Sequence, residues 1–120
     1  MTDRELLELA AKAAGMNVSW DHYDPDYCAG AEGMFLNGQR SPDNSKYWNP
    51  LTDDGDALRL AAKLKFHVGI NPGNKVFCTP TYSDKPTVFE SCERDGAQDP
   101  LAATRRAIVR AAAEIGRRMP

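Results

Sequence analysis

The sequence predicts an α+β protein in which a small, mostly antiparallel sheet is packed with three helices. Three long segments carry apolar residues at helical spacing, and four short segments have the composition of strands. No β-helix-β unit repeats along the chain, which argues against a doubly wound parallel sheet. With 120 residues, 42% apolar and 27% charged, the chain has the size and composition of one globular domain spanning residues 1–120.

The predicted helices are residues 3–14, 52–64 and 100–118. Thr2 precedes the first helix and Thr52 begins the second, and threonine is a favourable N-cap residue. The last helix places four apolar residues within one narrow arc, which we expect to face the sheet: Leu101, Ile108, Ala112 and Ile115.

The predicted strands begin with residues 65–71, where apolar and polar side chains alternate. A strong turn signal separates them from a partner strand at 75–79, and residues 87–92 form a third strand. A fourth candidate, residues 33–37, lies within the irregular segment 16–50. A loop of this length is either functional or a surface connection, and the sequence leaves both interpretations open.

Charge and composition narrow the possible partners and location. The net charge of −2 and the pI of about 5.6 argue against a polynucleotide partner, because such proteins carry a basic excess. No apolar stretch approaches the roughly 20 residues that cross a bilayer, and the N-terminus does not resemble a signal peptide. We therefore expect a cytosolic protein with no membrane partner. The odd number of cysteines, Cys28, Cys78 and Cys92, predicts free thiols.

Sequence motifs of catalysis are missing, so the sequence favours binding over turnover. It contains no phosphate-binding loop, dinucleotide fingerprint, nucleophile elbow or zinc-protease motif. His22 has no evident catalytic partner, and His67 is expected at the surface on the face opposite Phe66 and Val68. Residues 21–28 offer oxygens and an imidazole but match no known metal loop. We predict no catalytic residue, no metal and no cofactor.

A basic cluster, Arg105, Arg106 and Arg110, stands out in this acidic protein. Arg106 and Arg110 are one helical turn apart, so their guanidinium groups can clamp phosphate oxygens. The alternative is a solvated helix face on which Arg110 pairs with Glu114.

Trp48 and Asn49 stand directly before the second helix. An aromatic ring beside exposed helix N–H groups can form a platform for a planar, anionic ligand. The alternative is that Trp48 holds the loop to the core, because aromatic residues dominate core burial. Asp53, Asp54 and Asp56 also oppose an anion at that helix end.

Two blocks, "YWNPLTDDGDALRLAAKL" and "DPLAATRRAIVRAAAEIG", resemble small phage and prophage proteins of the phage α-β-α sandwich domain type, which include the lambdoid nin-region type. The resemblance is carried by Asn49-Pro50, by Asp53 to Asp56 and by Asp99 to Ala103, and with the N-terminal "TDRELLELAAKAAG" it spans most of the chain. It implies a phage gene, an α/β sandwich and expression in the cytoplasm of a host bacterium, but not a particular activity.

The chain is also similar, more distantly, to the type 1 Thoeris anti-defence sponge proteins. That similarity implies a homo-oligomer that sequesters a nucleotide immune signal, a cyclic ADP-ribose isomer or a cyclic oligonucleotide, without turnover. Arg106 and Arg110 would bind phosphate, and Trp48 or Phe89 would stack on a base near Asn49.

Two other functions stay open at this stage. The protein could be a phage accessory protein that binds a host protein, with an exposed apolar patch as its contact. It could also be an enzyme acting on nucleotides, which would require a catalytic constellation that the sequence does not show.

Overall fold

The computed structural model describes residues 2–22, 32–36, 48–70, 75–80, 88–91 and 100–119. These segments form the following elements in chain order: α1 (Asp3–Ala13), β1 (Val18–His22), β2 (Glu32–Leu36), α2 (Asp54–Leu64), β3 (Phe66–Ile70), β4 (Lys75–Pro80), β5 (Val88–Ser91) and α3 (Pro100–Arg118). All strand pairs are antiparallel, so the predicted α+β class is confirmed.

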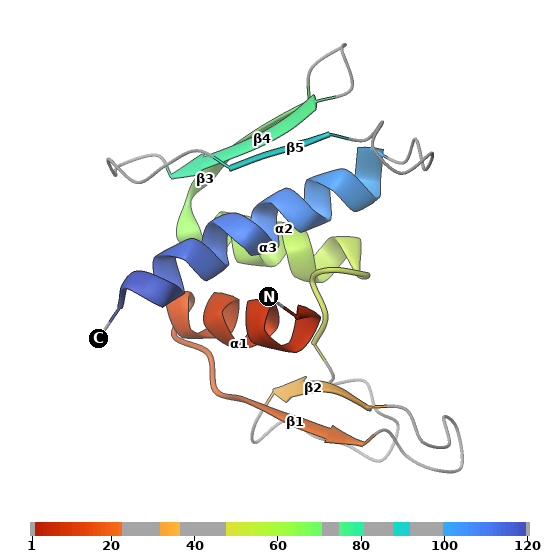
Figure 1. Ribbon diagram of the computed structural model, residues 1–120, viewed down its shortest axis with the longest axis vertical. Helices are drawn as coiled ribbons and strands as arrows, with labels where there is room; N and C mark the ends of the chain where they lie inside the picture. The colour runs from red at the N-terminus through yellow and green to blue at the C-terminus, as the bar shows by residue number, and fades with distance from the viewer. Residues whose placement is uncertain are drawn as a thin grey trace.

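The strands fall into two separate sheets. β3, β4 and β5 form a three-stranded sheet in that order, and β1 pairs with β2 alone. Figure 1 shows the larger sheet above α3, α2 beside α3, α1 below α3 and the β1–β2 pair beyond α1. The helices therefore lie between the two sheets.

The β1–β2 pair is attached to the rest of the protein through α1 and the segment before α2. The guanidinium group of Arg4 in α1 lies 5.4 Å from the ring centre of Trp20 in β1. On β2, the carbonyl oxygen of Met34 accepts a 2.8 Å hydrogen bond from the backbone N–H of Trp48. Met34 itself is buried. The sequence predicts β2 within one residue but treats β1 as irregular chain.

Local side-chain chemistry determines where the first two helices begin. Thr2 Oγ1 accepts from the Glu5 N–H at 3.2 Å, so the predicted N-cap of α1 is confirmed. The predicted N-cap Thr52 of α2 is wrong, because the Asn49 carbonyl accepts from both Thr52 and Asp53 in a turn. Asp53 is the N-cap instead, and its carboxylate accepts from the Asp56 N–H at 2.8 Å.

The central element is α3, which packs against α1, α2 and the larger sheet. Its buried residues are mostly small: Ala103, Ala107, Ile108, Val109, Ala111, Ala112, Ala113 and Gly116. Small side chains let neighbouring backbones approach closely. A Cβ atom added at Gly116 would collide with the backbone carbonyl oxygen of Leu9 in α1.

One position of α3 that was predicted to be covered by the sheet is exposed. Ile108 and Ala112 are buried and Ile115 is half-buried, but Leu101 is 56% exposed. The prediction for Leu101 is wrong because the first turn of α3 is exposed or half-buried, and its buried positions start at Ala103.

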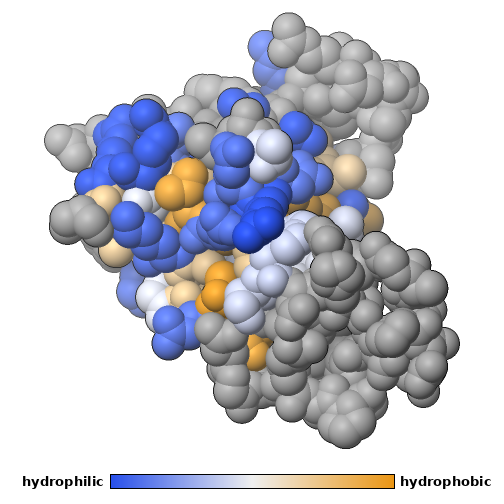
Figure 2. Space-filling view, turned by 60° about the horizontal axis from the view of Figure 1, so that its bottom comes forward, coloured by the Kyte–Doolittle hydropathy of each residue, from blue (hydrophilic) through white to orange (hydrophobic). Residues whose placement is uncertain are grey.

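The described surface is mainly polar on the face shown in Figure 2, where hydrophobic residues appear in small, separate areas. His67 in β3 is exposed, as predicted. Among the residues that the structure describes, no helix is both long and apolar enough to span a membrane.

We predict that Gly116→Ala destabilises the protein by about 1–3 kcal/mol, because the added methyl group forces the backbones of α1 and α3 apart. The matched control is Gly55→Ala in α2, where the added atom meets only the flexible end of Arg59 and the Asp53 carboxylate. That variant should stay within about 1 kcal/mol of the parent, because alanine favours the helix. Urea unfolding of both variants measures the difference, and equal stabilities would contradict the close α1–α3 packing.

Candidate functional site

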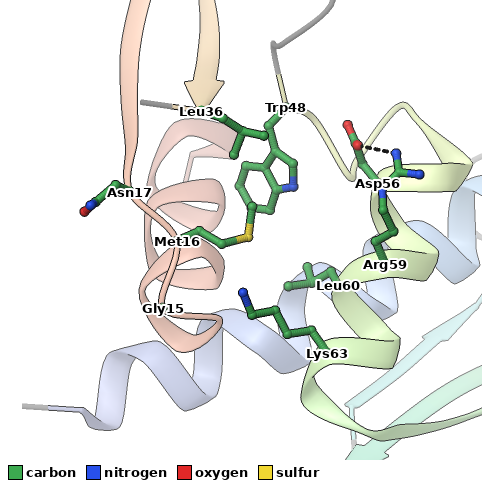
Figure 3. Close-up of a pocket in the computed structure, with 9 residues that line it drawn as sticks. All are labelled: Gly15, Met16, Asn17, Leu36, Trp48, Asp56, Arg59, Leu60 and Lys63. Carbon is green, nitrogen blue, oxygen red and sulfur yellow. Dashed lines mark hydrogen bonds and ion pairs between the residues drawn. The ribbon is translucent and has the colours of Figure 1, made fainter. Parts of the chain in front are cut away.

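A cavity of about 480 Å³ lies between the end of α1, the end of β2 and one side of α2 (Figure 3). Its size falls within the range of small-molecule binding sites. Nine residues from these separate segments line it: Gly15, Met16, Asn17, Leu36, Trp48, Asp56, Arg59, Leu60 and Lys63.

One side of the cavity is apolar. Met16 and Leu36 lie close to the indole of Trp48 in Figure 3, and Leu60 of α2 adds apolar surface to the lining. Trp48 is only 3% exposed and belongs to the hydrophobic core. The interpretation that Trp48 holds its segment to the core is therefore confirmed, and the same ring forms part of the cavity wall.

The opposite side of the cavity is polar and comes from α2. Arg59 Nη2 donates to Asp56 Oδ1 at 2.8 Å and lies 3.7 Å from Asp53 Oδ2. The hydrogen bond to Asp56 raises the pKa of the Arg59 guanidinium, which stays charged at every physiological pH. Asp56 also accepts from the Asn49 N–H at 3.0 Å, so both of its oxygens are engaged.

Lys63 follows Arg59 by one helical turn, so the two side chains share one side of α2. Figure 3 shows the Lys63 side chain extending into the cavity toward Met16. Within the described segments, Lys63 has no hydrogen-bond or ion-pair partner, whereas Arg59 is tied to acidic residues. Of the two cations that line the cavity, Lys63 is thus the more available to a ligand.

Asn49 builds the turn that leads into α2. Its side-chain oxygen accepts from the Leu51 N–H at 3.0 Å, and its carbonyl accepts from Thr52 and Asp53. Asn49 is next to Trp48 in sequence, but it is not among the residues that line the cavity.

Arg105 is also occupied by contacts within the protein. Its Nε donates to the Leu51 carbonyl at 2.9 Å, and its Nη1 donates to Asp54 at 2.5 Å. The Arg105 side chain is only 17% exposed. It therefore connects α3 to the turn before α2.

Arg106 and Arg110 are both exposed on α3. Neither lines the cavity beside Trp48. Glu114, the proposed partner of Arg110, accepts a 2.8 Å hydrogen bond from Arg117, and this bond together with the charges of nearby arginines, Arg110 among them, lowers the pKa of Glu114. Phe89 lies in β5 opposite Phe77, and its side chain is outside the described part of the structure.

The structure thus brings one predicted site residue, Trp48, together with Arg59 and Lys63, two residues that were not predicted as part of a site. A signal for this pair exists, because residues 59 and 63 have the same four-residue spacing as residues 106 and 110. Nothing in the sequence indicates that Met16 and Leu36 lie opposite them.

Across the described ranges, no group of histidine, cysteine and acidic residues is arranged to hold a metal ion. In the segment 21–28, considered above as a metal loop, residues 23–28 lie outside the described residues. Comparisons of the chain with family models, curated proteins and solved structures found no significant match.

We predict that Arg105→Ala destabilises the protein by about 1–3 kcal/mol, because the partly buried Leu51 carbonyl loses its charged donor. Arg106→Ala, one residue further along α3 and exposed, is the matched control and should change stability by less than about 0.5 kcal/mol. Thermal unfolding followed by circular dichroism compares the two. If both variants unfold like the parent, the assigned structural role of Arg105 is incorrect.

Proposed function

We propose that this protein binds a small phosphorylated molecule with a planar ring, of the nucleotide class, in the cavity between α1, β2 and α2, and holds it without turnover. The observation that carries this proposal is the Lys63 ammonium group extending into a cavity that has an apolar wall on one side. A cation beside apolar surface suits a ligand that is anionic at one end and flat and apolar at the other.

The charged end of the ligand would lie against α2. Lys63 supplies three N–H donors to phosphate oxygens, and Arg59 adds those of its donors that Asp56 does not use. Asp56 opposes a second anion, so we place the phosphate nearer to Lys63 than to Asp56. Asp56 keeps lone pairs that can accept from an amino or hydroxyl group of the ligand.

The flat part of the ligand would contact Met16, Leu36, Leu60 and the exposed edge of Trp48. Because Trp48 is 3% exposed, it acts as a wall rather than as a free stacking platform. The sequence suggested that the Trp48 ring stacks on a base. In the proposed site the ring instead forms a wall that still contacts the ligand.

Binding without turnover is supported by the groups that the described lining supplies. Asp56 is the one carboxylate among them, and it is held by Asn49 and Arg59. A nucleophile with an adjacent general base is absent from the described lining.

The more distant similarity to the type 1 Thoeris anti-defence sponge proteins supports a wider role. Holding a cyclic ADP-ribose isomer or a cyclic oligonucleotide in the cytoplasm of a host bacterium would withdraw that signal from the host's immune system. The chemistry of the cavity is compatible with either ligand class, because each combines phosphate with a planar base.

Isothermal titration calorimetry with cyclic ADP-ribose isomers and cyclic dinucleotides tests the proposal. We expect Lys63→Glu to weaken binding at least tenfold, because a charge-assisted hydrogen bond contributes about 1.5–3 kcal/mol. The matched control Lys75→Glu makes the same charge change at an exposed position in β4 and should bind like the parent. Equal binding by Lys63→Glu and the parent would contradict the placement of the ligand.

The double variant Arg106→Ala/Arg110→Ala compares this cavity with the site expected from the sequence. It should bind normally, since neither arginine lines the cavity. Loss of binding in that variant alone would move the site to α3. Absence of heat with every nucleotide would overturn the proposal, and chromatographic detection of a converted ligand would contradict binding without turnover.

A further inference from the structure

Among the residues that the structure describes, the outer side of β3 has no neighbouring strand. In the larger sheet β3 is an edge strand, paired only with β4 among the residues that the structure describes. Alternate residues of an antiparallel edge strand direct their N–H and C=O groups away from the sheet, which makes such an edge a template for another strand.

The helix-facing side of β3 is apolar but incompletely covered. Val68 pairs with Cys78 and Ile70 pairs with Val76, so all four side chains share that side of the sheet. Cys78 and Val76 in the central strand are fully buried, whereas Val68 is 38% and Ile70 57% exposed. The apolar face of the sheet therefore extends beyond the helices to the edge strand.

The two edges of the sheet differ in charge. β5 carries Glu90 in the sequence Val88–Ser91, and a charged residue on an edge strand discourages pairing with another chain. β3 has the sequence FHVGI, in which His67 is the single ionisable residue. Of the two edges, β3 is the one without a charge that opposes a further strand.

We propose that β3 pairs antiparallel with β3 of a second copy of this chain, about a two-fold axis through Val68. In this register Val68 opposes its own copy, Phe66 opposes Ile70, and His67 opposes Gly69. The three apolar positions stay on one face, and histidine meets glycine rather than another histidine. The two neighbouring registers that an antiparallel pair allows would place the two-fold axis at His67 or at Gly69. Either of them would leave part of the strand unpaired.

The surroundings of Gly69 fit this arrangement. The Phe77 ring lies so close to Gly69 that any added Cβ atom would collide with it. The partner's imidazole would therefore meet a glycine and an aromatic ring instead of a bulky neighbour. In this register opposed residues are both even-numbered or both odd-numbered. Whichever of the two sets directs its N–H and C=O groups outward in one copy therefore meets the same set in the other copy.

Such a dimer would have a continuous six-stranded sheet with the helices of both copies on the same side. A five-residue strand pair is small beside the roughly 800 Å² per partner of typical stable interfaces. Self-association should therefore depend on protein concentration. The interface does not depend on the nucleotide cavity, and it gives the homo-oligomer expected from the sequence a defined contact.

Sedimentation equilibrium of the full chain tests self-association. We expect the apparent mass to rise with concentration from 13.2 kDa toward twice that value. Val68→Lys should keep the protein monomeric, because it places two ammonium groups opposite each other. The control Leu58→Lys introduces the same charge at a 69% exposed leucine of α2 and should behave like the parent. A parent that stays monomeric at millimolar concentration, or a dimer disrupted only by Leu58→Lys, would overturn the proposal.

Disulfide cross-linking tests the register. Cys28 and Cys92 are replaced by serine, and Cys78 is kept because burial raises its pKa to about 12 and leaves it unreactive. In this background Val68→Cys should cross-link two chains on oxidation, since directly opposed Cα atoms lie about 4.5–5.5 Å apart. Ile70→Cys should not, because two copies of residue 70 are about 13 Å apart along the strands. Equal cross-linking of both variants would contradict the two-fold axis at Val68.

Discussion

The close contact between α1 and α3 is the constraint on which the rest of the structure depends. It requires a glycine at position 116, since a larger residue would collide with the Leu9 carbonyl. It also requires the run of buried alanines on α3, which lets this helix pack against α1, α2 and the sheet together. Because α1 is held in this position, its C-terminal end and Met16 lie where they can form one wall of the cavity.

A second set of interactions places the other wall. Asn49 makes the turn before α2, Asp53 caps the helix, and Arg105 reaches from α3 to the Leu51 carbonyl and Asp54. Arg105, one member of the basic cluster in the sequence, thus holds α2 in place. The side chains that α2 directs toward the cavity, Arg59 and Lys63, gain their positions from this network.

The sequence predicted well what local patterns determine. Helical periodicity located all three helices of the described chain, and capping chemistry located Thr2. It failed where placement depends on contacts between distant segments. Thr52 and Asp53 are both good caps, and only the turn at Asn49 selects between them. β1 is stabilised by β2, which begins 10 residues further along the chain, and by Arg4. No local sequence pattern indicates that Met16, Trp48 and Lys63 line one cavity.

Nuclear magnetic resonance during a titration with a cyclic dinucleotide or cyclic ADP-ribose tests the ligand site most directly. The backbone N–H signals of Met16 and Lys63 and the indole N–H signal of Trp48 are predicted to shift together, with one saturation curve. Shifts confined to Arg106 and Arg110 on α3, or no shifts at saturating ligand, would contradict the account.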